Sequence, residues 1–431
     1  MSAHRTKTII QNIVVSLLGR SLNLLSNLII IPLSLSTLGA RDYGILSVVI
    51  SISVFFAYAD FGLGSALVNA LSSAETLGDR ERARLIVTQT WTFLWLVVGA
   101  LLVAATVAYR SGAAQMLLPI VPADQLAIVW TLLVLGAGVG IPFALSQRVH
   151  FALQFGGQAQ FWTLMGRIAV LGGTAIAYLC HMNLASFVFV VGVLPTVVSA
   201  ISCVYLFAVL RADLHPSLSL RSLKGFGPGL REGLAFAALH VCTFAEIGLD
   251  PIIFSHFFGP VVVAENDVVV RLYTYIPAIA SIALVPIWPA ISAARAAGNH
   301  GWVSGLNLFT AVAVTAVALL GPLVLTTQLD AVLNIWLGRT SALDATTRIM
   351  IACFIGAQTM ALYQIYTLNA LGLVRVSSMV SFVMVILVLP AKLLALTWAG
   401  TIASAYGVLV VWYAIKIPVL QYVIQTHLRR P

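Results

Sequence analysis

Charged residues are scarce in this sequence. Only 9% of its 431 residues are Asp, Glu, Lys or Arg, whereas 60% belong to the set AVILMFWYC. A soluble domain carries about a quarter charged residues, so the chain lacks the polar surface that would keep it dissolved in water. A disordered chain is excluded as well, because disorder requires low hydrophobicity. The composition indicates a protein that crosses the membrane many times.

Motifs for ATP hydrolysis, metal binding and disulfide formation are also missing from the sequence. It contains no Gly-Lys pair, and therefore no Walker P-loop, and no HExxH motif. Its four cysteines lie far apart inside apolar stretches, which favours small core residues over a disulfide framework or a zinc site. We therefore expect no cofactor, no metal site and no catalytic cluster, although an enzyme embedded in the membrane stays an alternative at this stage.

Apolar stretches as long as a membrane-crossing helix follow one another along the whole chain. Such a helix needs about 20 residues, and open strands cannot satisfy their backbone groups in lipid. Helices are expected near residues 11–37, 44–72, 85–109, 125–147, 161–180, 185–209, 233–258, 268–292, 303–327, 345–368, 376–397 and 402–424. The predicted fold class is thus an all-α polytopic membrane protein with about twelve spans.

Basic residues are distributed unequally between the two predicted sides of the membrane. If the N-terminus is cytoplasmic, that side collects Arg5, Lys7, Arg80, Arg82, Arg84, Arg148, Arg211, Arg221, Lys224, Arg231, Arg295, Arg375, Arg429 and Arg430, and the other side has Arg41, Arg110, Arg339 and Arg348. Cytoplasmic loops carry such an excess. Both termini are therefore predicted to be cytoplasmic, and no nucleic-acid partner is needed to explain the net charge of +9.

The longest polar interruption, residues 211–232, divides the chain near its midpoint. We interpret it as a cytoplasmic linker between an N-terminal six-helix lobe, 1–210, and a C-terminal six-helix lobe, 233–431. A weak internal repeat supports this division, because an offset of 220 maps Gly39 onto Gly259 and the loop at Gly78 onto the loop at Gly298. Each half starts on the same side, so the repeat is predicted to be parallel.

Polar residues of the first span share one helical face. These residues are spaced by three, four and seven positions, so they form one stripe along the helix. They are Asn12, Ser16, Arg20, Asn23, Asn27 and Ser34. A charge near mid-membrane costs roughly 2.5–3.5 kcal/mol on insertion scales, so the stripe should face protein or water. Two interpretations stay open. Arg20, Asn23 and Asn27 either bind substrate in a water-filled cavity, or the stripe packs against other helices while Arg20 extends to the interface.

Acidic residues and a histidine mark two further spans. On the seventh span, His240, Glu246 and Asp250 fall within about a third of the helix circumference, and Asp60 lies deep in the second span. A carboxylate shielded from water titrates near neutral pH, so these four residues are candidates for ion coupling. The alternative is an ion pair inside the protein, which is the preferred interpretation for Asp60 with an arginine.

Cations inside other spans complete the list of candidate residues. Arg271 begins the eighth span and Lys416 lies well inside the twelfth. Inward-facing cations attract phosphate, which Arg holds through bidentate hydrogen bonds, so both residues are candidates for substrate binding. For Arg167 and Lys392, which lie near span ends, we expect the side chains to extend to the interface.

Short motifs of glycine, proline and acidic residues stand in both halves of the sequence. The first half contains Ile31-Pro32, Leu38-Gly39, Asp42-Tyr43-Gly44-Ile45 and Asp60-Phe61-Gly62-Leu63-Gly64, and the second contains Asp250-Pro251-Ile252-Ile253 before Gly259 and Pro289-Ala290-Ile291-Ser292 before Gly298-Asn299. The chain resembles the polysaccharide-exporter family, whose members include the O-antigen repeat-unit flippases (Wzx type) of the multidrug/oligosaccharidyl-lipid/polysaccharide (MOP) exporter superfamily.

The resemblance implies a MATE-like pair of six-helix bundles around a central cavity that opens alternately to each side. The implied cargo is an undecaprenyl-pyrophosphate-linked oligosaccharide, which would cross the bacterial inner membrane to the periplasmic leaflet, and the implied partners are the bilayer and the polysaccharide polymerase machinery. Arg20 resembles the first-span cavity arginine of related lipid II flippases, but their adjacent Arg-Asp pair is not matched here, which weakens that assignment.

Two other functions stay open on the sequence. A cation-coupled multidrug extruder of the same superfamily would suit the acids of the seventh span, although the basic residues favour an anionic cargo. A membrane-embedded glycan polymerase or ligase belongs to a different class. Such an enzyme usually needs a large periplasmic loop, and none of the predicted outer loops reaches that size.

Overall fold

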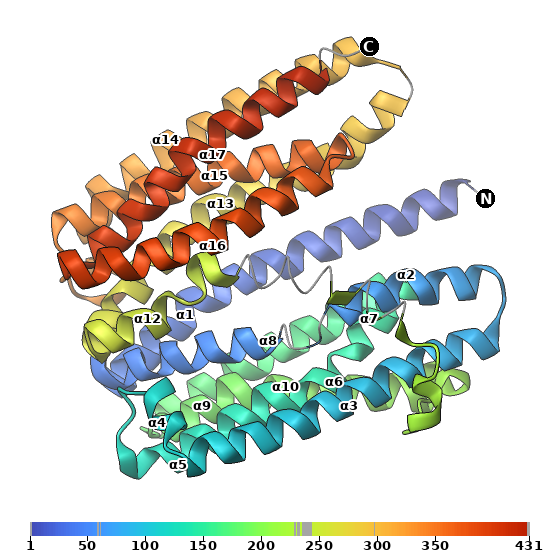
Figure 1. The fold of residues 1–431 in the computed structure, drawn as a ribbon, viewed down its shortest axis with the longest axis horizontal. Coiled ribbons are helices and arrows are strands. Elements are labelled where there is room, and N and C mark those ends of the chain that lie inside the picture. Colours follow the sequence, from blue (N-terminus) through green and yellow to red (C-terminus); the bar gives the residue numbers. More distant parts are fainter. Residues whose placement is uncertain are drawn as a thin grey trace. The chain divides into compact units, whose positions relative to one another are not determined.

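Helices make up all the regular structure in the part of the chain that the computed structural model describes, residues 2–57, 60, 62–227, 230, 233–234, 244–296 and 298–428 (Figure 1). Nine helices in these ranges are long and apolar enough to cross a membrane. The predicted all-α polytopic fold is confirmed. The chain divides into two compact units, Met1–Ala264 and Glu265–Pro431.

The first unit opens with two helices that together contain the first two predicted spans. Helix α1 covers Ser2–Ala57 and turns sharply at Gly39, whose φ of 70° lies in the left-handed region that glycine tolerates. The second predicted span, 44–72, is broken between the end of α1 and α2, Leu63–Thr76. Helix α3, Arg80–Arg110, follows after a tight loop and leads into the short α4, Ala113–Leu117.

The fourth and sixth spans each contain π-helical turns. The fourth consists of α5 Ala123–Leu133, η2 Val134–Gly138, α6 Val139–Phe143 and α7 Leu145–Ala152. The sixth consists of α9 Leu184–Val188, η3 Phe189–Val193, α10 Leu194–Tyr205 and η4 Leu206–Leu210. Between them lies an uninterrupted helix, α8 Gly156–Leu179. A π-turn inserts one residue and shifts the faces of a helix, so each of these spans changes direction partway.

The start of the predicted linker is an ordered strap along α3. It contains two 3₁₀ turns, η5 Ala212–Leu214 and η6 Leu220–Leu223, and both pack on α3. The hydroxyl of Thr92 donates to the carbonyl of Ser217 at 3.3 Å and accepts from the backbone N–H of Ser219 at 3.2 Å. Gln89 donates to the carbonyl of Ser222 at 2.7 Å. These bonds satisfy backbone groups that a free loop would leave to water.

The last part of the first unit packs on α1. Helix α12, Asp250–Phe257, contacts α1, and the rings of Phe55 and Phe244 lie 5.4 Å apart between centroids. At Gly44, the backbone of α1 touches the backbone at Pro260. A Cβ on Gly44 would lie 1.9 Å from the carbonyl oxygen of Pro260. Glycine is therefore required at this crossing.

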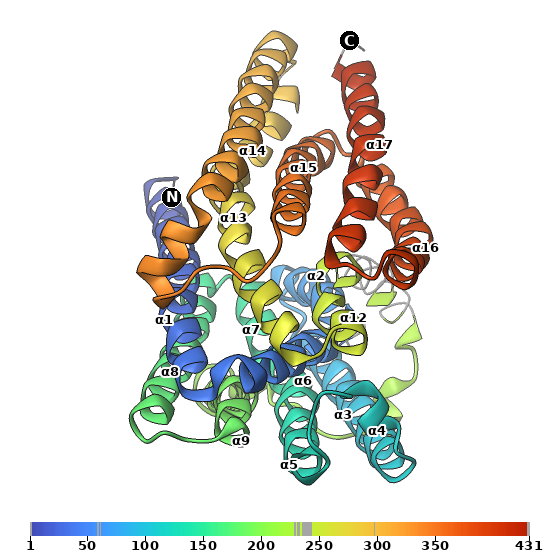
Figure 2. The same ribbon diagram turned by 90° about the vertical axis from the view of Figure 1, so that its left-hand side faces the viewer.

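Long helices form the second unit. They are α13 Pro260–Ala296, which begins in the first unit, α14 His300–Leu337, α15 Ala345–Ala370, α16 Val374–Ala399 and α17 Ile402–Leu428. Helix α15 lies between α14 and α17 (Figure 2). Its Phe354 ring packs 5.8 Å from Tyr406 and 5.9 Å from Tyr413 between centroids, which fixes α15 against α17.

Left-handed residues recur at matching places in the two halves of the sequence. The predicted pairs Gly39 with Gly259 and Gly78 with Gly298 all have φ between 70° and 78°. Two further pairs with positive φ, separated by 218 and 219 residues, are Gln154 with Gly372 and His181 with Gly400. The recurrence supports the internal repeat. The two six-helix lobes, the linker at 211–232 and the cytoplasmic termini stay predictions.

Candidate functional site

A polar cavity of about 420 Å³ lies within the first unit, where the second, fourth and sixth spans approach one another. Its lining residues come from α1 to α3, from the fourth span and from the sixth span. They are Ser53, Asp60, Gly64, Leu94, Gly136, Ala137, Gly140, Ile141, Ala144, Leu145, Gln147, Arg148, Val191, Gly192, Pro195, Thr196 and Ser199. Two opposite charges, three hydroxyls and an amide thus share one cavity.

Asp60 reaches this cavity because the second span is broken beside it. Its Oδ1 accepts a hydrogen bond of 2.8 Å from the backbone N–H of Gly62, and Gly62, with a φ of 66°, is the residue from which α2 starts. An unbroken helix would have used that N–H internally. The Asp60–Gly64 motif therefore places a carboxylate next to a helix N-terminus, where negative charge is favoured.

Arg148 of α7 approaches the same point from the opposite direction. The hydroxyl of Ser72 donates to the carbonyl of Ala152 at 2.9 Å, which sets α2 and α7 side by side. Arg148 lies one turn before Ala152, and its side chain reaches Gly64 at the start of α2. A Cβ at Gly64 would lie 2.7 Å from Arg148 Nε and 3.0 Å from Asp60 Oδ2. Gly64 thus leaves the space that both side chains approach.

Paired π-turns form the opposite wall. A Cβ at Gly136 in η2 would lie 2.6 Å from the backbone carbon of Gly192 in η3, so the fourth and sixth spans touch through their backbones. Thr196 donates to the carbonyl of Gly136 at 2.6 Å. π-Turns release backbone groups from the helical pattern and are frequent at functional sites. The cavity is consequently lined by backbone polar groups as well as side chains.

Comparisons with known proteins identify the family. The sequence profile of the family described as polysaccharide biosynthesis protein matches residues 9–295. The chain belongs to this family. No curated protein matches the chain. The resemblance to polysaccharide exporters is confirmed at this level.

Solved structures similar to this polysaccharide biosynthesis protein are MATE transporters. An inward-facing multidrug resistance MATE transporter of the MOP superfamily matches with a TM-score of 0.71 and 12% identity, over 94% of this chain and 96% of its own. An outward-facing transporter of the same description matches with a TM-score of 0.63 and 13% identity, over 99% of this chain and 97% of its own. The bent form of a Vibrio cholerae MATE transporter matches with a TM-score of 0.62 and 16% identity, over 98% of this chain and 97% of its own.

The chain is thus a multi-pass helical member of the polysaccharide biosynthesis family, with the fold of MATE transporters. The cavity inside the first unit belongs to a fold that is also found in transporters. In the part of the chain that the structure describes, no three His, Cys, Asp or Glu residues come together as metal ligands.

The structure places the predicted residues of the first unit at different points. Asp60 lies in the cavity with Arg148. Asn27 is half-buried in α1 and does not line the cavity. Glu246 is half-buried, and Asp250 is 1% exposed at the first position of α12. Helix α1 passes through positions 20 and 23, but the side chains of Arg20 and Asn23 lie outside what the structure describes, as does His240.

In the second unit, the predicted cations have partners close by. Arg271 donates through Nε to Asp267 Oδ2 at 2.7 Å, one turn away on α13. Lys416 is 5% exposed, and its ammonium lies 4.8 Å from the centre of the Tyr413 ring, a cation–π contact. The expected extension of Lys392 to the interface is wrong. It is 1% exposed, because its face of α16 is covered by protein.

Sequence analysis missed Arg148 as part of a site, as it missed Gln147, Thr196 and Ser199 of the same cavity. The place of Arg148 near the end of an apolar stretch led to its assignment as a marker of the cytoplasmic side. A signal was present, because a carboxylate at the depth of Asp60 needs a positive partner. The sequence does not show which arginine reaches it.

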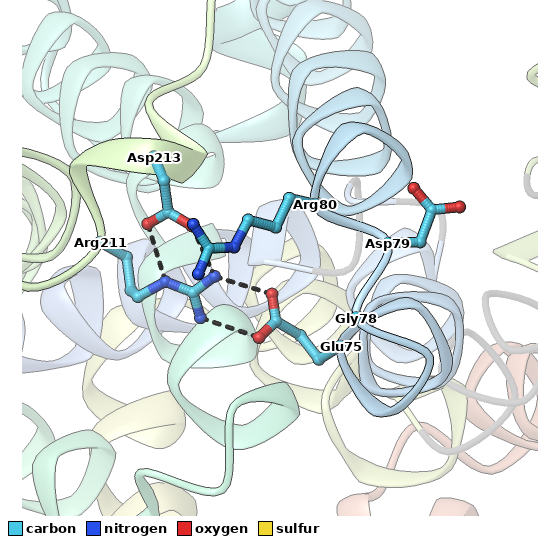
Figure 3. A pocket seen from close by; sticks show the side chains of 6 residues that line it. All are labelled: Glu75, Gly78, Asp79, Arg80, Arg211 and Asp213. Atoms are coloured by element: carbon cyan, nitrogen blue, oxygen red, sulfur yellow. Dashed lines mark hydrogen bonds and ion pairs between the residues drawn. The ribbon is translucent and has the colours of Figure 1, made fainter.

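A second polar pocket, of about 560 Å³, lies where the strap meets the loop between α2 and α3 (Figure 3). Arg211 binds Glu75 through two hydrogen bonds of 2.8 and 3.0 Å and Asp213 through two of 2.8 Å. The hydrogen bonds of Arg211 to Asp213, and to a smaller extent those to Glu75, raise the pKa of Arg211. The hydrogen bond from Arg211 in turn holds the pKa of Asp213 below its ordinary value. This cluster fastens the beginning of the strap.

Proposed function

We propose that this protein is a flippase that moves an undecaprenyl-pyrophosphate-linked oligosaccharide repeat unit from the cytoplasmic to the periplasmic leaflet of the bacterial inner membrane by alternating access. Its membership of the polysaccharide biosynthesis family supports this cargo class. The observation that carries the proposal is the guanidinium of Arg148, which is directed to Gly64 inside a polar cavity of a transporter fold.

Arg148 suits a diphosphate headgroup chemically. A guanidinium presents N–H groups in a planar fork that matches two phosphate oxygens, and the bond strengthens where water is scarce. Gln147, Thr196 and Ser199 line the same cavity and supply amide and hydroxyl groups for sugar hydroxyls. A volume of about 420 Å³ lies within the usual range for small-ligand sites. In the proposal it holds the phosphates and the first sugar, while the prenyl chain stays in lipid.

In the proposal, the site has two states that differ in the protonation or orientation of Asp60. Without cargo, its carboxylate offsets the charge of Arg148 beside it. A diphosphate brings negative charge to the same point, so binding is favoured when Asp60 is protonated or turned away. This is how an ion gradient would drive the cycle. In the wider proposal, Arg20, Asn23, Asn27, Arg271 and Lys416 also contact cargo, and His240, Glu246 and Asp250 contribute to coupling.

The carboxylate of Asp60 in the cavity also favours a second candidate, a cation-coupled multidrug extruder. Export of hydrophobic organic cations from cells or vesicles distinguishes the two. Robust cation export that depends on Asp60 and is indifferent to Arg148→Gln would replace the flippase proposal.

The decisive test uses a strain that lacks the gene and carries variants on a plasmid. Arg148→Gln should abolish surface polysaccharide and accumulate lipid-linked repeat units facing the cytoplasm, while the protein reaches the membrane at normal amounts. Arg148→Lys should restore part of the export, because it keeps the charge but loses the fork. The matched control is Arg84→Gln, an exposed arginine of α3 outside the cavity. Normal surface polysaccharide in the Arg148→Gln strain would contradict the proposal.

A further inference from the structure

A groove of about 440 Å³ runs along the first unit between the last third of α3 and the start of the fourth span. Its lining residues are Leu102, Ala105, Thr106, Tyr109, Arg110, Ala127, Trp130, Thr131, Val134 and Leu135. They share no residue with the candidate site. The groove is therefore separate from the candidate site.

Three polar side chains in the walls of the groove are already bonded within the protein. The hydroxyl of Thr106 donates to the carbonyl of Leu102 and that of Thr131 to the carbonyl of Ala127, both at 2.7 Å. The indole N–H of Trp130 donates to the carbonyl of Ala105 at 3.1 Å and ties α5 to α3. What the walls present is hydrocarbon. Leu102 is 38% exposed and Leu135 45%, so the groove is open along its side.

One end of the groove carries an uncompensated charge. Arg110 is the last residue of α3 and is exposed, and no acidic residue is among those that line the groove. None of the ion pairs in the described part of the chain includes Arg110. Tyr109 beside it, 40% exposed, adds a phenol. The groove is thus apolar along its length and positive at one end.

The dimensions match one leaflet of a bilayer. Leu102 and Arg110 are separated by eight helical residues, which is about 12 Å of helix at 1.5 Å per residue, and half of the hydrocarbon core is about 15 Å. A hydrocarbon chain that lies against Leu102 would therefore bring its headgroup to the level of Arg110.

We propose that this groove binds one acyl chain of an anionic phospholipid, with the lipid phosphate on Arg110. The charge selects the headgroup. A phosphatidylglycerol keeps its negative charge when Arg110 pairs with the phosphate, whereas a phosphatidylcholine brings its own ammonium into competition. The apolar walls bind the acyl chain, and Arg110 determines which headgroup is bound preferentially. The proposal is independent of the cargo that the protein carries.

The headgroup is tested on the full-length protein, purified in detergent and offered phosphatidylglycerol or phosphatidylcholine with identical chains in native mass spectrometry. The wild type should retain phosphatidylglycerol in preference. Arg110→Gln should bind it about tenfold more weakly, at the level of phosphatidylcholine, because a charge-assisted hydrogen bond is lost. Arg41→Gln, an exposed arginine outside the groove that is predicted on the same membrane side, should leave the preference unchanged.

The acyl chain is tested by filling the groove. Ala127→Trp should weaken retention of both lipids, while Ala104→Trp, at an exposed position of α3 outside the groove, should not. Size-exclusion chromatography verifies that each variant is folded. Wild-type lipid retention in both Arg110→Gln and Ala127→Trp would show annular lipid only and overturn the proposal. Loss in Ala127→Trp without loss in Arg110→Gln would overturn the assignment of an anionic headgroup.

Discussion

Arg148 and Asp60 both approach Gly64, which has no side chain to separate them. Arg148 Nε and Asp60 Oδ2 would lie 2.7 and 3.0 Å from a Cβ at that glycine. Two opposite charges this close to one point attract strongly where water is scarce. Both residues line the cavity, so its wall carries a cation and a carboxylate near the same point.

Substitution of Gly64 by alanine should reduce export without unfolding the protein. The new methyl group would displace the arginine, a flexible side chain that moves at little cost, so the guanidinium leaves its place. We expect at least a tenfold loss of surface polysaccharide in a complementation assay, with membrane levels and thermal unfolding close to wild type. Gly172→Ala in α8, where a Cβ has nothing within 4 Å, is the control. Full export by the Gly64→Ala variant would contradict the placement of Arg148.

Substitution of Gly44 by alanine should instead destabilise the fold. The atoms that a Cβ would meet there are backbone atoms of Pro260, at 1.9 to 3.1 Å, and they cannot rotate away. Overpacking of this kind costs roughly 1–3 kcal/mol. We expect a lower melting temperature of the purified protein in detergent. Gly99→Ala should instead raise the melting temperature, because alanine has a higher helix propensity than glycine. Gly99 lies on an exposed part of α3, and a Cβ there has nothing within 4 Å.

The spans were predictable because lipid leaves the backbone little choice. The prediction of 345–368 corresponds to α15, Ala345–Ala370, which begins where Asp344 accepts a hydrogen bond from the N–H of Thr347. The prediction of 185–209 corresponds to Leu184–Leu210. Hydrophobicity and flanking polar residues determine such boundaries to within a few residues.

The interior of the site was less predictable, because it depends on register rather than on hydropathy. The π-turns η2 and η3 leave no mark in an apolar stretch, yet they bring Gly136 against Gly192. Arg148 reaches Gly64 because α7 packs on α2, and the bond between Ser72 and Ala152, which joins these helices, links residues 80 positions apart. Asp60 was predicted to pair with an arginine; the structure places Arg148 near it at Gly64, and the ion pair stays a prediction.

Removal of the carboxylate of Asp213 should change how stability depends on pH. Its pKa is held below 3.8, chiefly by the hydrogen bond from Arg211. A group with a lowered folded pKa contributes stability above its unfolded pKa, and this contribution is lost as the pH falls through the folded value. Asp213→Asn should therefore melt below wild type at pH 7, and the difference should shrink below about pH 4.

The control for this acid effect is Asp124→Asn. Asp124 is exposed in the first turn of α5 and takes part in none of the ion pairs of the described chain. Melting temperatures in detergent between pH 3 and pH 7 measure both variants. A constant gap between wild type and Asp213→Asn across that range would show that the bond to Arg211 does not stabilise the strap.

Thr196 should hold the two π-turns together through one hydrogen bond. Its hydroxyl donates to the carbonyl of Gly136 at 2.6 Å, so Thr196→Val, which keeps the shape, leaves that carbonyl unsatisfied at a cost of about 1–3 kcal/mol. We expect a lower melting temperature and a smaller loss in Thr196→Ser, which keeps the donor. Thr163→Val removes a hydroxyl bonded to the carbonyl of Ala159 within its own helix and should change the melting temperature less. Equal effects of Thr163→Val and Thr196→Val would mean that the bond between the spans adds nothing beyond a local one.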